Sequence, residues 1–275
     1  MKPEEVEVIR LVVQARSGMV VNPDKTYRIE TQLAPLVRRE GFADLSELVQ
    51  TIQAKRDNTL MWSVAEALTN NETSFFRDAA PFQQFREEIL PQLAAKRGER
   101  PIRVWSAACA SGQEPYSLAM LLEDEASKYP GLKVELFGSD LSERCLEKAQ
   151  SGLYTQFEVQ RGLPIRLLVR HFTRTEEAWV LSPRVRQMVR WRRVNLLADL
   201  RGLGQFDVIF CRNVLSSFEP TVARRVVEQL AAALPAYGRL VLGIDETLIG
   251  VTDAFTPVAG RRGIYAPNPT FSEAA

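Results

Sequence analysis

The chain has 275 residues and an almost balanced charge, with 35 Lys and Arg against 34 Asp and Glu and a net charge of +1. That length accommodates a large α/β domain and a smaller helical one, and the balance excludes broad electrostatic attraction to nucleic acid. No run approaches the roughly 20 apolar residues of a membrane-spanning helix, and the start, Met1-Lys2-Pro3-Glu4-Glu5, lacks the apolar core of a signal peptide, so we expect a cytoplasmic protein that is not inserted in a membrane.

Residues 4–70 alternate amphipathic helices with short breaks at Gly18, Asn22-Pro23-Asp24 and Gly41. Asp44-Leu45-Ser46-Glu47 has the pattern of a capping box that opens a further helix. We therefore expect an all-α N-terminal domain over residues 1–79. A linker helix over residues 80–98 should follow it and be disturbed at Pro91.

From residue 99 to residue 275 the pattern changes to short apolar runs that alternate with helices. The runs expected as strands are 102–105, 133–138, 206–210 and 239–243, and the helices are expected at 114–127, 141–151 and 219–233. This alternation predicts a mostly parallel sheet with helices on both faces. At about 165–192, the segments 178–181 and 187–191 are typical of short strands around a Ser182-Pro183 turn, which predicts a small antiparallel insertion.

Polar loops follow the predicted strands at the edge where such sheets bind ligands. The first, Ser106 to Ser117, is rich in small residues and suits a nucleotide-like cofactor, or else is a tight strand-to-helix turn. Asp140 can accept hydrogen bonds from both hydroxyls of a ribose, or else cap the next helix. With Asn195-Leu196 and Cys211-Arg212-Asn213-Val214, these loops converge on one edge, which indicates a cofactor crevice.

Few side chains are suited to other chemistry. Cys109, Cys145 and Cys211 are odd in number and widely spaced, which predicts free thiols and neither a disulfide framework nor a metal site. His171 is the single histidine, so a multi-histidine metal site is excluded. Its flanks are typical of a helix end, and we assign it no catalytic role.

Five stretches, in this order, resemble the chemotaxis receptor protein-glutamate O-methyltransferase (CheR) family. They are Asn-x-Thr-x-Phe-Phe-Arg from residue 71, Trp-Ser-Ala-Ala-x-x-x-Gly-x-Glu-Pro-Tyr-Ser from residue 105, Ser139-Asp140, Asn195-Leu196, and Phe-Asp-x-x-Phe-Cys-Arg-Asn-Val from residue 206. The resemblance covers nearly the whole chain. It implies a class I methyltransferase fold: a Rossmann-like, mostly parallel seven-stranded sheet with a small antiparallel β insertion, preceded by an all-helical domain.

The resemblance also implies an activity. The protein would transfer a methyl group from S-adenosylmethionine to glutamate carboxylates on the cytoplasmic helices of a chemoreceptor-like protein, giving S-adenosylhomocysteine and needing no metal. A glutamate side chain has a pKa of about 4.3 and is ionised at neutral pH, so it needs no general base. Catalysis would then rest mainly on the alignment of carboxylate, methyl and sulfur.

Site residues are implied by position in the matching motifs. The cofactor-binding residues are expected to be Asn71, Thr73, Arg77, Glu114, Asp140 at the ribose, Asn195 and Leu196 at the adenine end, and Asn213 and Val214 at the methionine end. Arg77 is also the candidate catalytic residue, because its planar guanidinium can bind a carboxylate with two parallel hydrogen bonds.

The chain departs from the family pattern at three places. Ser216-Ser217 replaces the usual Ile-Tyr, and Gly243-Ile244-Asp245-Glu246 replaces Gly-His-Ser-Glu. The second helix carries Arg28, Arg38 and Arg39 but not the longer basic face that family members use against acidic receptor helices. The turn Arg174-Thr175-Glu176-Glu177 lacks the glycine-containing extension of members that tether to a receptor's C-terminal pentapeptide, so we expect independence from such a tether. Two alternatives remain open: a regulatory or scaffold module that binds the cofactor or its product with little or no turnover, and a methyltransferase for a small molecule.

Overall fold

The computed structural model describes residues 1–55, 57–98 and 100–272, and the chain divides into two compact units. The helical unit comprises Met1–Asn70 with Ser216–Ala223, and the sheet unit comprises Asn71–Leu215 with Arg224–Ala275. Across the described ranges, no helix has both the length and the apolar character needed to cross a bilayer.

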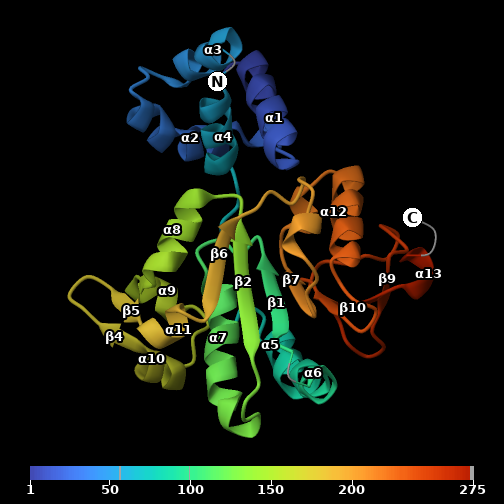
Figure 1. The fold of residues 1–275 in the computed structure, drawn as a ribbon. Helices are drawn as coiled ribbons and strands as arrows, with labels where there is room; N and C mark the ends of the chain where they lie inside the picture. The colour runs from blue at the N-terminus through green and yellow to red at the C-terminus, as the bar shows by residue number, and fades with distance from the viewer. Residues whose placement is uncertain (56, 99, 273–275) are drawn as a thin grey trace. The chain divides into compact units, whose positions relative to one another are not determined.

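The helical unit is an α-helical bundle (Figure 1). Its elements are α1 (Pro3–Ser17), the short turn η1 (Pro23–Lys25), α2 (Thr26–Glu40), α3 (Leu45–Lys55) and α4 (Asn58–Ala67). Gly18 and Gly41 end α1 and α2 in the left-handed conformation, with φ of 72° and 76°, as the sequence predicts. Asp44 Oδ1 accepts the Glu47 N–H at 2.9 Å, which confirms the predicted start of α3.

The segment Ser216–Ala223 belongs to the helical unit although it lies far from it in sequence. Met19 and Phe218 form an antiparallel β-bridge, and the Val20 N–H donates a 2.8 Å hydrogen bond to the Ser217 carbonyl oxygen. The backbone at Ser217, where the family has tyrosine, is therefore bound to the connection between α1 and α2.

A seven-stranded sheet forms the centre of the other unit. Its strands are β1 (Ile102–Ala107), β2 (Val134–Asp140), β6 (Val189–Arg193), β7 (Val208–Cys211), β8 (Arg239–Val241), β9 (Phe255–Pro257) and β10 (Ile264–Pro267), and their spatial order is β6-β2-β1-β7-β8-β10-β9. Neighbouring pairs are parallel, except that β10 runs antiparallel to β8 and β9. The predicted, mostly parallel seven-stranded sheet is thus confirmed.

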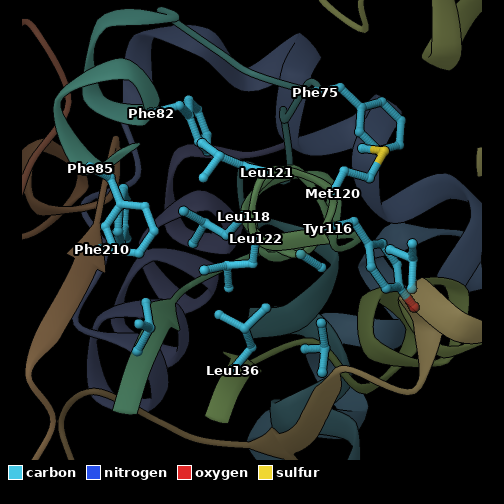
Figure 2. Close-up of a cluster of buried hydrophobic side chains, with 14 of the residues drawn as sticks. Phe75, Phe82, Phe85, Tyr116, Leu118, Met120, Leu121, Leu122, Leu136 and Phe210 are labelled. Atoms are coloured by element: carbon cyan, nitrogen blue, oxygen red, sulfur yellow. The ribbon is translucent and has the colours of Figure 1, made fainter. Parts of the chain in front are cut away.

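Helices around the sheet bury its faces. They are α5 (Ala80–Gln84), α6 (Leu90–Arg97), α7 (Gln113–Glu125), α8 (Glu143–Ser151), α12 (Pro220–Ala232) and the short C-terminal α13 (Pro269–Ser272), with turns η3 (Ala126–Lys128), η4 (Arg201–Leu203) and η5 (Leu215–Ser217). Helix α7 packs against β1, β2 and β6, and its Leu118, Met120 and Leu122 enter a core with Phe82 and Phe210 (Figure 2). Apolar burial of this extent is the main force that holds the sheet unit together.

The disturbance expected at Pro91 lies just before that residue. Between α5 and α6 the chain forms a π-helical turn, η2 (Phe85–Ile89), in which the Leu90 N–H bonds to the Phe85 carbonyl oxygen. Proline at 91 has no N–H for the carbonyl four residues earlier, and a π turn relieves the mismatch without breaking the helix.

A small three-stranded antiparallel sheet is present as predicted, and the expected strand at 178–181 is one of its three strands. It has the order β3-β5-β4, with β3 (Leu153–Tyr154), β4 (Phe172–Arg174) and β5 (Trp179–Leu181), and it carries α9 (Gln156–Gln160), α10 (Ile165–His171) and α11 (Pro183–Arg186). The segment 187–191, predicted to pair with 178–181, instead contributes to β6, which lies parallel to β2. Residues 153–188 are called the insertion below.

Candidate active site

The candidate site lies where the strand order of the main sheet reverses. From β1 the chain moves outward to β2 and then to the edge strand β6, and it returns to place β7 on the other side of β1. In open α/β sheets the loops diverge at such a switch point and leave a crevice beyond the carboxyl ends of the strands. Because β1, β2, β6 and β7 are parallel, the loops that follow them all begin at this same edge of the sheet.

The loop after β1 is built from small residues in unusual backbone conformations. Ala108, Ala110 and Gly112 have φ of 54°, 48° and 90°. The Cys109 N–H donates to the Ser139 carbonyl oxygen at 2.9 Å, so the loop is tied to the end of β2. Small side chains here let a ligand approach the backbone directly ahead of α7.

Asp140 ends β2 with a carboxylate that is only 6% exposed. Its Oδ2 accepts the Ala110 N–H and its Oδ1 accepts the Ser142 N–H, both at 2.8 Å. Helix α8 begins at Glu143 and is capped by the Ser142 hydroxyl, so the alternative that Asp140 is the cap is wrong. A buried carboxylate at the end of this strand can accept hydrogen bonds from a ligand that offers two hydroxyl groups.

A charge network centred on the buried Arg212 joins three segments at the switch point. Arg212, directly after β7, donates from Nη1 to Glu114 Oε2 at 2.9 Å and from Nη2 to Asp78 Oδ2 at 2.8 Å. Its Nη2 also donates to the Arg77 carbonyl oxygen at 2.7 Å. The second oxygen of Glu114 accepts the Ser106 hydroxyl at 2.7 Å. With 2% of its side chain exposed, Arg212 therefore fixes β7, α7 and the segment 77–78 to one another.

The segment from Asn71 to Ala79 carries the first motif and is ordered along its length. Phe75 is fully buried, and the Phe76 N–H donates to Ser117 Oγ at 2.9 Å. Arg77 is half-buried, and its Nη1 donates to the Glu72 carbonyl oxygen at 2.9 Å. Thr73 is half-buried and Asn71 is exposed. The segment is thus a shaped part of the site and not a loose linker.

Left-handed backbone at residues other than glycine is concentrated at this site. Within the described ranges such residues are Phe76, Asp78, Ala79, Ala108, Ala110 and Asn213. The left-handed conformation costs a residue with a side chain on the order of 1–2 kcal/mol, so it persists only where surrounding contacts hold the backbone in place. All six fall on the first-motif segment, the loop after β1 or the loop after β7, and strain of this kind is typical of functional sites.

Asn213 and Val214 follow β7 and are held by Glu246. The Glu246 carboxylate accepts three backbone N–H groups, from Asn213 at 2.7 Å, Leu215 at 2.9 Å and Gly243 at 2.9 Å. A Cβ at Gly243 would lie 2.6 Å from Asn213 Nδ2 and 3.0 Å from Glu246 Oε2, so a larger residue there would displace these side-chain ends. The glutamate of the family's Gly-His-Ser-Glu pattern is thus present in this chain as Glu246, and it is the residue that holds this loop.

Asn195 and Leu196 lie at the same edge, beyond the end of β6. Asn195 Oδ1 accepts the Leu197 N–H at 3.0 Å, which sets a local turn. Leu196 is 6% exposed, and its carbonyl oxygen accepts a hydrogen bond from Gln229 Nε2. These hydrogen bonds connect Asn195 and Leu196 only to their own loop and to α12. They do not join the hydrogen bonds that link the first-motif segment, the loop after β1 and the loop after β7.

Other titratable groups nearby are unsuited to proton transfer or nucleophilic attack. Burial, together with the charges of Asp140 and Glu114, holds the pKa of the Cys109 thiol well above its usual value. Burial and Glu246 act in the same way on the pKa of Cys211. The three cysteines are free thiols, and no cluster of His, Cys, Asp or Glu suited to a metal occurs within the described residues.

Arg212 and Asp78 are the site residues that sequence reasoning missed. Arg212 stands inside the last motif and Asp78 directly follows the first one, yet the partners of Arg212 lie 98 and 134 residues away from it in the chain. One signal was present: a charged residue directly after the fully buried strand Val208–Cys211 is unusual unless its charge is paired.

This sheet topology, with an acidic residue after the second strand and a shaped loop after the first, defines a class I S-adenosylmethionine-dependent methyltransferase. A family profile described as "CheR methyltransferase, SAM binding domain" matches residues 71–264. The chain therefore belongs to the CheR methyltransferase family, and the buried Asp140 carboxylate and small-residue loop fit its cofactor.

Curated relatives agree over almost the whole chain. Chemotaxis protein methyltransferase 1 of Vibrio cholerae is 37% identical over 255 residues, which cover 92% of each chain. Chemotaxis protein methyltransferase of Vibrio parahaemolyticus is also 37% identical, with the same coverage. Chemotaxis protein methyltransferase 1 of Pseudomonas aeruginosa is 37% identical over 264 residues, covering 94% of this chain and 96% of the relative.

Proposed function

We propose that this protein methylates glutamate side chains on the cytoplasmic helices of a chemoreceptor-like protein, and that it works in the cytoplasm. The observation that carries the proposal is the make-up of the site. It offers a guanidinium and buried carboxylates, while its thiols have raised pKa values. An acceptor that is already ionised suits these groups, and a glutamate carboxylate meets that condition at neutral pH.

The cofactor roles follow the motif positions. When bound, S-adenosylmethionine supplies an activated methyl group. We propose that Asp140 accepts the ribose hydroxyls, that Asn195 and Leu196 hold the adenine end, and that Asn213 and Val214 hold the methionine end. Glu114, with Asn71, Thr73 and Arg77, completes the set; both Glu114 oxygens already accept one bond each and keep a lone pair for an ammonium group.

Arg77 is proposed to orient the acceptor carboxylate or that of the cofactor. One of its N–H groups is engaged by the Glu72 carbonyl oxygen, which restrains the side chain. A guanidinium has five N–H donors, so the others suffice for a bidentate bond to a carboxylate. Holding the nucleophile in line contributes to rate without any proton transfer.

Partner recognition is proposed to be independent of a C-terminal pentapeptide tether. The turn between β4 and β5 is closed tightly, because the Thr175 N–H donates to the Ala178 carbonyl oxygen at 2.8 Å and the Ala178 N–H donates to Thr175 Oγ1 at 3.1 Å. A turn of this size supports the proposal. Micromolar binding of a receptor C-terminal pentapeptide would contradict it.

The test of glutamate methylation uses methyl-labelled S-adenosylmethionine and membranes from the cell that makes the protein. We expect label on a membrane protein that mild base releases as methanol, the behaviour of a carboxylic ester. The matched control is Asp140→Ala, which should transfer no label. Base-stable label, or no label on protein, would refute glutamate esterification.

A second function is favoured by Ser216-Ser217. A serine cannot provide the aromatic wall of the family's tyrosine, so the protein would bind cofactor or product and act as a regulatory module with little turnover. Calorimetry showing tight binding of S-adenosylhomocysteine, together with no methyl transfer to membranes, would favour this function over the first.

A further inference from the structure

Gly162, in the turn between α9 and α10 of the insertion, lies against the first-motif segment. Its φ is +81°, and a Cβ built there would lie 2.1 Å from the Phe75 carbonyl oxygen. Backbone therefore packs directly on backbone, and any side chain at this position would displace either the turn or Phe75. Such an approach fixes position more firmly than a contact between flexible side chains, because backbone cannot change rotamer to relieve it.

Arg161, the preceding residue, reaches the same segment through its side chain. Its Nη2 pairs with Glu72 Oε1 at 2.8 Å, and the guanidinium lies over the Phe157 ring at 5.7 Å. The pair lowers the pKa of Glu72, and the nearby Arg77 charge acts in the same direction. The Glu72 carbonyl oxygen in turn accepts the Arg77 guanidinium. Arg161, Glu72 and Arg77 thus form a continuous chain from the insertion to the candidate catalytic residue.

Aromatic rings complete the connection. The buried Phe75 ring packs edge-on against Tyr154 at 5.0 Å and Phe172 at 5.7 Å, both on strands of the insertion, and Figure 2 shows Phe75 beside Met120 of α7. The Tyr154 hydroxyl donates to the Ser111 carbonyl oxygen at 2.8 Å. The insertion therefore contacts both the first-motif segment and the loop after β1.

We propose that the insertion is a positioning element for the reaction: Arg161 and Gly162 hold the segment 71–77 so that Arg77 is presented to the site. This role rests on the proposed function of Arg77 and adds to it the residues that set its place. Arg161 and Gly162 touch neither cofactor nor acceptor and act through Glu72 and Phe75.

The first test is Gly162→Ala, with Gly131→Ala as the matched control. Gly131 has φ of +80°, and a Cβ there meets nothing within 4 Å, so the control carries the same backbone strain without the clash. We expect Gly162→Ala to lower the rate of methyl transfer at least about tenfold, to weaken S-adenosylhomocysteine binding only severalfold by calorimetry, and to speed hydrogen exchange of the Phe76 amide at least about tenfold. Gly131→Ala should change none of the three.

The second test is milder, in case Gly162→Ala fails to fold. Arg161→Ala should raise exchange within 71–77 and weaken product binding about threefold, Arg161→Lys should restore part of both, and thermal midpoints should stay equal. The control, Arg184→Ala, removes a 2.6 Å pair between another part of the insertion and Glu123 of α7. If wild type binds the product and the Arg161 variants match it in binding and exchange, the positioning role is wrong. If wild type itself binds no product, the proposed function fails instead.

Discussion

Arg212 donates a 2.9 Å hydrogen bond from Nη1 to Glu114 Oε2, and the two side chains are 2% and 11% exposed. The bond connects the end of β7 to the first turn of α7 across the point where the strand order reverses. Since Asp78 shares the same guanidinium, one buried arginine neutralises both the buried Glu114 carboxylate and the more exposed Asp78 carboxylate. The cofactor loops are therefore organised around a positive charge that does not itself have to touch a ligand.

Arg212→Met should destabilise the sheet unit severely. It leaves Glu114 and Asp78 without a counter-charge, and breaking a buried pair in this way typically costs about 3–5 kcal/mol. Urea unfolding measures the loss. Arg224→Ala, which removes an exposed pair with Glu228, should leave the unfolding midpoint almost unchanged. Equal effects of the two substitutions would show that the Arg212 network is not structurally important.

Asp140→Ala should abolish measurable binding of the cofactor and its product. Charge-assisted hydrogen bonds contribute about 1.5–3 kcal/mol each, so losing two to ribose hydroxyls predicts a loss of at least about a hundredfold. Calorimetry with S-adenosylhomocysteine gives the affinity. Asp140→Asn keeps one acceptor and should be intermediate, and near-normal affinity of Asp140→Ala would remove this residue from the site.

Arg77→Ala should separate binding from turnover. If Arg77 orients the acceptor, kcat should fall by about a hundredfold or more while product affinity changes only severalfold. Arg77→Lys should recover little, because an ammonium cannot form the bidentate bond. A loss of affinity as large as the loss of turnover would instead place Arg77 on the cofactor.

His171 should make stability depend on pH. Burial lowers its pKa from 6.5, with the positive charge of Arg170 acting in the same direction, and Nε2 has no hydrogen-bond partner among the described residues. The unfolded chain then takes up a proton more readily, so the stabilising contribution is complete above about pH 6.5 and is lost as the pH falls below it. His171→Leu should flatten this slope in urea unfolding; a parallel pH profile would contradict it.

Ser217→Tyr should raise methyl transfer if the missing aromatic limits the rate. The backbone bond between the Val20 N–H and the Ser217 carbonyl oxygen does not involve the side chain, so the substitution need not disturb it. Initial rates with membranes, compared with Ser217→Phe, test whether the ring or the hydroxyl matters. An unchanged rate would show that this chain has no need of tyrosine there.

Much of the fold could be predicted because the responsible signals are local. Gly18 and Gly41 end helices through their own backbone preference, and the alternation of apolar runs with helices yields the parallel sheet. The failure at 187–191 has a physical cause. Strand β6 lies at the edge of the sheet, and its residues are buried, half-buried and exposed without a regular alternation. A strand of a surface hairpin has the same pattern, so periodicity cannot distinguish an edge strand from a hairpin strand.

The site was predictable only in part for a similar reason. Asp140 and the loop after β1 follow strands directly, so their place at the sheet edge comes from topology alone. The contacts of Arg212 with Asp78 and of Gly162 with Phe75 join segments that are distant in the chain, and only the folded backbone brings them together. Strand β3 was missed because two residues, Leu153–Tyr154, are too short to show a period.

The approach of Gly162 to the Phe75 carbonyl oxygen also limits how this enzyme can be re-engineered. A chimaera that receives only the larger insertion of another methyltransferase would set a foreign turn against a native Phe75. Residues 72–77 and the turn at 161–162 should be exchanged together, as one cassette, whenever the insertion is transplanted.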